Sequence, residues 1–249
     1  MKVSHTQPIG FFDIDYEKHL QLTAAARFFQ DMATRHASLM GIGADVLFSR
    51  GFTWLLHRLE MDFCRYPVLG EEITVTTWSR GFKHHQGLRE YLISSDSGIV
   101  ARGTSVWIFF DFVNKRVKKV PLEIAAHYSF EPEAALETEL REWQPCGKIE
   151  PEQETAISLR YGDFDQHFHV NNTVYLGFVE TLFHTVPELS GRRIGNVKIR
   201  FCREIGRDTP GVVAATVRQD GRYLFNIRRQ AGLGDAGAVY ADGEFSVMD

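Results

Sequence analysis

The densest group of polar side chains in the chain lies in the segment DFDQHFHVNN, residues 163–172. Alternate residues of an extended segment share a face, so one face is expected to carry a run of carboxyl and imidazole groups. These groups belong to Asp163, Asp165, His167 and His169. Because a carboxylate or an imidazole can activate water, the segment favours hydrolysis of an ester or a thioester.

Two asparagines, Asn171 and Asn172, close this segment and are typical of a helix start, where an amide oxygen caps free backbone N–H groups. A helix N-terminus also carries a partial positive charge. Its N–H donors can hold the oxyanion that develops when water attacks a carbonyl. The segment therefore combines water-activating groups with an oxyanion-binding group.

The same residues allow two other interpretations. An Asp-rich turn before a helix commonly serves only as a turn and a cap. Two histidines beside carboxylates are potential metal ligands, but no third or fourth ligand stands at a familiar spacing. No GxSxG motif occurs in the sequence, so Ser/His/Asp catalysis is not expected, and no P-loop occurs. We therefore expect neither a metal nor a cofactor. Cys64 and Cys202 lie in strand-like patterns and are expected to be small core residues rather than nucleophiles.

Each half of the chain is predicted to contain one long helix and several strands. Residues 23–39 and 172–186 carry apolar side chains at helical spacing, followed by glycine or proline. Strands of the first half are expected at 53–66, 71–79, 87–94 and 99–112. Those of the second half are expected at 156–161, 195–205, 212–219, 222–230 and 238–247. Their short connections indicate antiparallel sheets.

An internal repeat relates the two halves. A shift of 150 positions places Asp13, Asp15 and His19 on Asp163, Asp165 and His169. The tripeptide Phe-Cys-Arg then occurs in both halves, ending at residues 65 and 203. The first copy has leucine at the position of Asn172 and tyrosine at the position of Glu204. We therefore expect the second copy to be catalytic and the first to be a degenerate partner.

Composition sets the broad class of protein. The 249 residues are 44% hydrophobic and 24% charged, which is a globular mixture large enough for two domains. The predicted division is 1–120, a connector at 121–154, and 155–249. A net charge of -4 excludes a globally basic nucleic-acid-binding protein. Three cysteines without a CxxC pair, and the lack of a signal-peptide pattern or a long apolar run, favour a cytoplasmic protein without membrane attachment.

The sequence resembles the acyl-acyl-carrier-protein thioesterases of plant plastids and bacteria. The resemblance covers nearly the whole chain and follows five segments in order: residues 65–78, 87–89, 101–110, 163–180 and 201–208. It implies an α+β fold of two fused hotdog domains, each a long helix wrapped by an antiparallel sheet. It also implies hydrolysis of a fatty acyl thioester in fatty acid biosynthesis, with no metal or cofactor.

The resemblance extends to individual site residues. Asp165, His169 and Glu204 fall on the family's aspartate, histidine and glutamate. His167 stands where the family usually has asparagine, and Ile205 stands where plant members have cysteine. We hypothesise that Glu204 or Asp165 acts as general base on water or attacks the thioester directly, while His169 orients a partner or shuttles a proton. His167 would take over the orienting role of the amide.

Strand alternation raises one difficulty for this assignment. It places Glu204 on the face opposite to Val197 and Ile199, away from the core side of its strand. A β-bulge near Arg203 would re-aim the carboxylate, and bulges are common beside active sites. We therefore expect a bulge at that position.

The substrate is expected to engage both copies. The acyl chain would bind in the aromatic-rich first copy, where Trp54 and Trp107 are the predicted contacts. Asn171 and Asn172 are the predicted substrate-binding residues of the second copy. An acidic carrier protein would dock on a basic patch. Its expected members are Arg80, Lys83, Lys115, Arg116, Lys118 and Lys119.

Two rival functions remain open, an acyl-CoA thioesterase and a non-catalytic acyl-binding hotdog protein. The chain is expected to be a monomer or a homodimer.

Overall fold

The computed structural model describes residues 1–145, 147–232 and 237–248. The chain divides into two compact units. Unit 1 comprises Met1–Leu20 and Ala24–Glu142, and unit 2 comprises Gln21–Thr23 and Trp143–Asp249. The boundary between Glu142 and Trp143 falls within the segment that the sequence predicts to be a connector.

Unit 1 holds a long helix and an antiparallel sheet. The helices are α1 (Leu22–Leu39), α2 (Ala44–Ser49) and α3 (Leu122–Ala125), with a 3-10 turn η1 (Phe11–Asp13). The strands are β1 (Val3–Pro8), β2 (Phe52–Phe63), β3 (Glu72–Lys83), β4 (Gln86–Ser95), β5 (Gly98–Asp111) and β6 (Arg116–Val117). Their order in the sheet is β1-β3-β4-β5-β2, with β6 pairing with β5.

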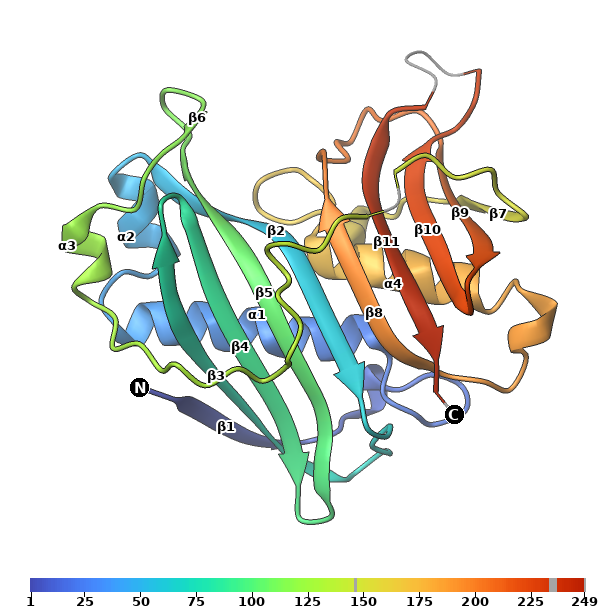
Figure 1. Cartoon of the computed structure of the whole chain (residues 1–249), viewed down its shortest axis with the longest axis horizontal. Helices are drawn as coiled ribbons and strands as arrows, with labels where there is room; N and C mark the ends of the chain where they lie inside the picture. Colours follow the sequence, from blue (N-terminus) through green and yellow to red (C-terminus); the bar gives the residue numbers. More distant parts are fainter. Residues whose placement is uncertain (146, 233–236, 249) are drawn as a thin grey trace. The chain divides into compact units, whose positions relative to one another are not determined.

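Helix α1 lies against one face of this sheet, behind the strands in the view of Figure 1. Phe29 of α1 stacks on Tyr91 of β4, with ring centroids 4.3 Å apart. The same ring covers Gly103 of β5, where an added Cβ would lie 2.3 Å from it. The helix therefore approaches the sheet closely because position 103 has no side chain.

The opposite face of the sheet is covered by the chain that follows α3, which crosses in front of the strands in Figure 1. Residues on this face, such as Glu90, alternate with those that contact α1. The Ala135 N–H donates to the Glu90 carboxylate, and the Trp78 indole N–H donates to the Glu133 carbonyl. The Arg58 guanidinium donates to the Leu140 carbonyl. These contacts satisfy buried polar groups that the sheet alone would leave unpaired.

Unit 2 repeats this topology. Its elements are β7 (Gln153–Ile157), η2 (Tyr161–Asp163), α4 (Asn172–Phe183), η3 (Pro187–Leu189), β8 (Ile194–Phe201), β9 (Val212–Gln219), β10 (Arg222–Arg229) and β11 (Val239–Val247). Read from β7, its sheet order is β7-β9-β10-β11-β8, which is equivalent strand by strand to β1-β3-β4-β5-β2 of unit 1. Helix α4 packs on the sheet through Phe183, whose ring meets that of Phe245 edge-on at 5.7 Å. The predicted duplication is thus present in the fold.

Several elements depart from the sequence predictions: among the strands, the one expected at 156–161 lies at Gln153–Ile157, the one expected at 53–66 ends at Phe63, and the one expected at 71–79 extends to Lys83. Strand β1 was not predicted, because its mostly exposed sequence VSHTQP lacks an apolar face. The predicted helix 172–186 ends earlier, at Phe183, and Pro187 begins the separate turn η3. The predicted strand 195–205 ends at Phe201, where a bulge follows.

Among the described residues, no helix is both long and apolar enough to cross a membrane.

Candidate active site

A buried carboxylate closes the loop that carries the candidate catalytic residues. Asp163 ends η2 and is 3% exposed, and one of its carboxylate oxygens accepts the Arg160 backbone N–H at 2.8 Å. Its carbonyl accepts the Asn171 N–H at 2.9 Å, which joins the two ends of the loop. Asp163 is therefore a structural residue of the loop, and it does not share a face with the other polar groups.

Asp165 forms a tight turn within this loop. One oxygen of its carboxylate accepts the His167 N–H at 2.8 Å, and its carbonyl accepts the Phe168 N–H at 3.0 Å. Phe168 adopts a φ of 64°, which the turn requires. The predicted extended segment is therefore wrong. Its alternation is replaced by a turn that the Asp165 side chain stabilises and that presents His169.

Glu204 reaches the same loop through a bulge at the end of β8. The N–H groups of Cys202 and Arg203 both donate to the Tyr240 carbonyl, at 2.8 and 3.1 Å, which is the hydrogen-bond pattern of a β-bulge. Just beyond, the Ile205 carbonyl accepts the Val170 N–H at 2.9 Å. The expected bulge near Arg203 is confirmed, and it ends β8 four residues earlier than predicted.

The bulge brings Glu204 against His169. Their Oε2 and Nε2 atoms are 3.1 Å apart. The side chains of His169 and Glu204 are 40% and 63% exposed, so water reaches both groups. An imidazole beside a carboxylate in contact with solvent is suited to activating a water molecule. His167 is exposed, and its backbone N–H, bound by Asp165, shapes the turn.

Helix α4 begins directly after this loop. The Asn171 side-chain oxygen accepts the Thr173 N–H at 2.9 Å, and the Asn171 carbonyl accepts the Val174 N–H. Asn171 is thus the helix cap that the sequence predicts. Asn172 is the first helical residue, and its backbone N–H has no hydrogen-bond acceptor among the described residues.

Tyr175 is a further member of this site, although its position in the predicted helix indicates only an apolar side chain facing the core. It is 2% exposed, and its hydroxyl donates to the Arg203 carbonyl at 3.4 Å. Burial raises its pKa above the ordinary tyrosine value. A buried tyrosine needs a partner for its hydroxyl, which is the signal that could have identified it. It supports the backbone that precedes Glu204.

The structure also shows where two of the cysteines and Ile205 lie. Cys64 and Cys202 are exposed, so their prediction as core residues is wrong. Both follow a strand end at a bulge rather than lying inside a strand. Ile205, at the position of the plant cysteine, is fully buried. Cys146 lies outside the described residues.

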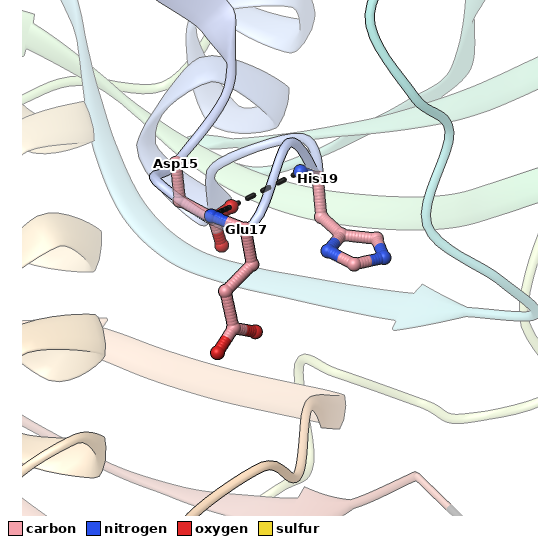
Figure 2. A group of neighbouring side chains, drawn as sticks. All are labelled: Asp15, Glu17 and His19. Carbon is pink, nitrogen blue, oxygen red and sulfur yellow. Dashed lines mark hydrogen bonds between the residues drawn. The ribbon is translucent and has the colours of Figure 1, made fainter.

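The first copy of the loop has the same backbone. Asp15 Oδ1 accepts the N–H groups of Glu17 and His19, as Figure 2 shows. Potential ligand atoms of these three residues lie within 4.8 Å of one another, so the metal-like grouping of side chains occurs in the first copy. Tyr66, at the position of Glu204, stacks on Phe63 with centroids 4.6 Å apart. The imidazole-carboxylate pair of unit 2 therefore has no counterpart at this position.

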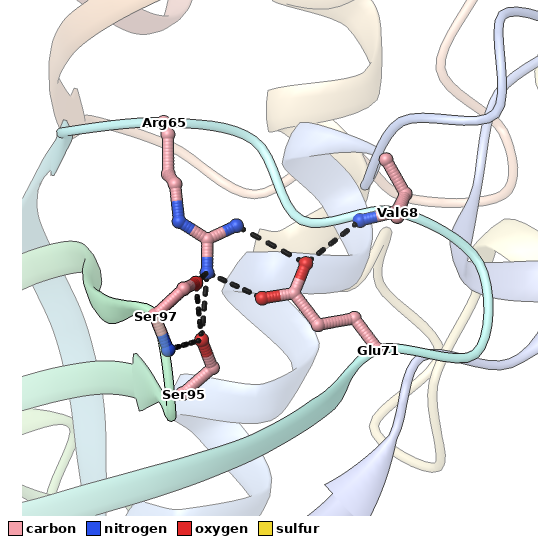
Figure 3. Close-up of polar contacts among 5 residues, drawn as sticks. All are labelled: Arg65, Val68, Glu71, Ser95 and Ser97. Atoms are coloured by element: carbon pink, nitrogen blue, oxygen red, sulfur yellow. Dashed lines mark hydrogen bonds and ion pairs between the residues drawn. The ribbon is translucent and has the colours of Figure 1, made fainter.

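The loop that follows Tyr66 is fastened by a side-chain ion pair. Arg65 binds the Glu71 carboxylate through both terminal nitrogens and also donates to the hydroxyls of Ser95 and Ser97 (Figure 3). The Arg65 hydrogen bond is the main cause that lowers the pKa of Glu71 to about 2. Unit 2 has the matching Arg203 but Thr209 in place of Glu71. Its loop lacks the same clasp.

The two tryptophans predicted to bind substrate lie in unit 1. Trp54 packs on Phe82 and Phe109, with ring centroids 5.4 and 5.0 Å away. The Trp107 indole N–H donates to Ser105 Oγ at 2.8 Å. Both tryptophans are half-buried, and their contact with substrate stays a prediction.

Comparison with known proteins places the chain in a family. Residues 2–128 match the acyl-ACP thioesterase N-terminal domain, and residues 147–237 match the acyl-ACP thioesterase C-terminal domain. The palmitoyl-acyl carrier protein thioesterase of Cuphea hookeriana is 24% identical over 214 residues, which cover 81% of this chain and 51% of that protein. The chain thus spans about half the length of this relative.

Solved structures agree in fold. The 12:0-ACP thioesterase of Umbellularia californica superposes with a TM-score of 0.82 at 20% identity, covering 99% of this chain and 97% of that one. An acyl-ACP thioesterase of Bacteroides thetaiotaomicron gives 0.83 at 17% identity, covering 99% and 98%. The fold is therefore the predicted α+β double hotdog. With both domain families matched in order along the chain, this protein belongs to the acyl-ACP thioesterase family.

Proposed function

We propose that the chain hydrolyses fatty acyl thioesters of acyl carrier protein to a free fatty acid and the carrier protein. The observation that carries the proposal is the contact between His169 and Glu204, which is open to water and adjoins the start of α4. Membership of the family supports the substrate class. In this proposal unit 2 supplies the chemistry and unit 1 houses the acyl chain beside Trp54 and Trp107.

Glu204 is the general base in the proposed reaction. Its carboxylate takes a proton from water as the water oxygen attacks the thioester carbonyl carbon. His169 orients the carboxylate through the 3.1 Å contact of its Nε2 with Glu204 Oε2. The Asn172 N–H supports the oxyanion of the tetrahedral intermediate. When the intermediate collapses, the C–S bond breaks and the departing thiolate recovers the proton that Glu204 took from water.

Asp165 has a positioning role in this scheme. One of its oxygens is committed to the His167 N–H, so the carboxylate is part of the turn that presents His169. Glu204 has no comparable backbone contact among the described residues and faces water. For this reason we assign the base to Glu204. His167 retains the orienting role inferred for the family's amide position.

The test is the turnover of one acyl group on acyl carrier protein by wild type and E204Q. Loss of a general base typically costs about 10²- to 10⁴-fold, so kcat of E204Q should fall by that order. The matched control is E188Q, which makes the same change at an exposed glutamate of η3 and should leave kcat unaltered. Full activity of E204Q would overturn the assignment.

The two rival functions give different results in the same assay. An acyl-CoA thioesterase would turn over the coenzyme A ester faster than the carrier-protein ester. A non-catalytic acyl-binding protein would bind either ester and release no fatty acid.

We place the protein in the cytoplasm, in keeping with the free thiols of Cys64 and Cys202.

A further inference from the structure

One end of unit 1 gathers basic side chains from two separate segments. The turn between β3 and β4 and the segment that follows β6 lie side by side, because the Val120 N–H donates to the His84 carbonyl at 2.9 Å. The Lys118 N–H donates to the Phe109 carbonyl at 3.0 Å, which keeps the second segment against β5. Five cations result, named here the basic end: Lys83, Lys115, Arg116, Lys118 and Lys119.

The positive charge of the basic end is largely uncompensated. Among the described residues, none of its five cations forms an ion pair within 4.0 Å. The neighbouring carboxylate of Asp111 is 3% exposed, accepts the backbone and side-chain N–H groups of Asn114, and offsets part of the charge of Lys118 and Arg116. Four of the five cations are exposed, and the fifth, Lys118, lies over the ring of Phe52 at 4.4 Å.

Arg80 does not belong to this group, which corrects the sequence prediction. Its guanidinium pairs with Glu90 at 3.3 Å and Glu139 at 3.7 Å on the sheet face that the connector covers. The correction has a physical cause. The register of β3 against β4 shifts between Ser79 and Gly81, so Arg80 lies at a bulge and its guanidinium meets these carboxylates, whereas Lys83 lies at the strand end.

Exposed apolar side chains accompany the cations. Val113 and Val117 flank Lys115 and Arg116 and are 69% and 50% exposed. Leu122, at the start of α3, is 84% exposed. A free phosphate needs only donors, whereas a folded acidic partner also offers apolar surface to bury. The mixture therefore favours an acidic protein over a small anion.

We propose that the basic end is the docking surface for the acidic carrier protein that delivers the acyl group. The inference rests on the proposed function and specifies the surface that selects the carrier over coenzyme A. The cations would attract the carrier and set its orientation, and the apolar side chains would be buried on contact. The surface would contribute to KM and not to the bond-breaking step, since it carries no group of the catalytic pair.

The experiment compares wild type with K83E/K119E, which reverses one charge in each of the two segments. One acyl group is presented on carrier protein and on coenzyme A. We expect KM for the carrier-protein ester to rise on the order of tenfold, with kcat and the coenzyme A reaction unchanged. Added salt should raise KM for wild type more than for the variant.

The control is R35E/K148E, which makes the same change in net charge at exposed positions elsewhere. An equal KM rise in the control, an equal rise with the coenzyme A ester, or no rise at all would each overturn the proposal. Binding of the carrier protein to wild type and K83E/K119E is measured separately. If wild type hydrolyses neither ester, the proposed function fails, and this binding measurement alone decides whether the basic end docks the carrier.

Discussion

The position of Glu204 depends on backbone geometry more than on its place in a strand. Alternation along β8 directs it away from the core side, and the bulge at Cys202 and Arg203 turns it toward His169. A single inserted residue therefore converts an ordinary strand end into a site. At the residue scale the chemistry depends on the few groups that hold this bulge.

Tyr175 is one such group, and Y175F tests it. The substitution removes the hydroxyl that donates to the Arg203 carbonyl and keeps the ring in place. Loss of one hydrogen bond of this kind corresponds to about 1 kcal/mol, so we expect kcat to fall about fivefold with KM little changed. A thermal melt of the same variant separates positioning from unfolding. Unchanged kcat in a stable variant would exclude Tyr175 from the site.

Asp165 gives a second prediction at this scale. D165N keeps an oxygen that can accept the His167 N–H, whereas D165A removes the turn's side-chain acceptor. If Asp165 only positions His169, D165N should lose less than about tenfold in kcat and D165A should lose more. A loss in D165N as large as that of E204Q would instead assign proton transfer to Asp165.

His36 gives a prediction for stability against pH. Its side chain is fully buried, and Arg89 Nη1 lies 2.7 Å from its Nδ1. Burial, followed by the Arg89 charge, lowers its pKa from 6.5 to about 4. The unfolded chain takes up the proton first, so His36 contributes stability above pH 6.5 that is lost as the pH falls toward 4. Denaturant unfolding should show H36Q losing less stability than wild type between about pH 7 and 5.

At the scale of elements, the contact between α1 and its sheet depends on Gly103. An added Cβ would meet the Phe29 ring at 2.3 Å and the Glu60 carbonyl at 3.0 Å, and the carbonyl cannot rotate away. G103A should therefore destabilise unit 1 by about 2 kcal/mol. The control is G70A, where an added Cβ meets nothing within 4 Å, although its φ of 80° costs some strain. A G103A protein as stable as wild type would show that α1 can shift outward.

The Arg65–Glu71 clasp makes a second element-scale prediction. E71Q should lower stability at neutral pH by about 1 kcal/mol or less, because the pair is partly exposed to solvent. The pKa of Glu71 lies at about 2 in the folded protein, against 4.5 for an ordinary glutamate. Its contribution is thus present above pH 4.5 and is lost as the pH falls through about 2. The difference in stability between wild type and E71Q should shrink over that range.

At the scale of the whole molecule, the sequence was most informative where it repeats. The equivalence of Asp15 with Asp165 and of His19 with His169 predicted two copies of one fold, which the sheet orders confirm. Periodicity also located α1 and most strands to within a few residues. The positions of helices and strands follow from local patterns of apolar side chains, which can be read from the sequence alone.

What the sequence did not predict depends on contacts between distant segments. The alternation expected for residues 163–169 fails because Asp165 bonds to its own backbone, and a turn competes with a strand there. Arg80 was expected to be a free cation, and only the fold brings Glu139 to it. The support that Tyr175 gives to the bulge likewise joins residues 28 positions apart.

The clasped loop of unit 1 has a consequence for how the site could have arisen and could be rebuilt. Both copies share the turn aspartate, the histidine and the backbone bonds, so these are what folding of the loop requires. Two of the positions at which the copies of the loop differ bear on the site: unit 2 has Glu204 where unit 1 has Tyr66, and Thr209 where unit 1 has Glu71. In the proposed function, unit 1 thus serves as a reference copy of the loop that lacks the Glu204 carboxylate. Replacing Tyr66 with glutamate would test whether a second imidazole-carboxylate pair can form in unit 1, where the turn and its histidine are already present.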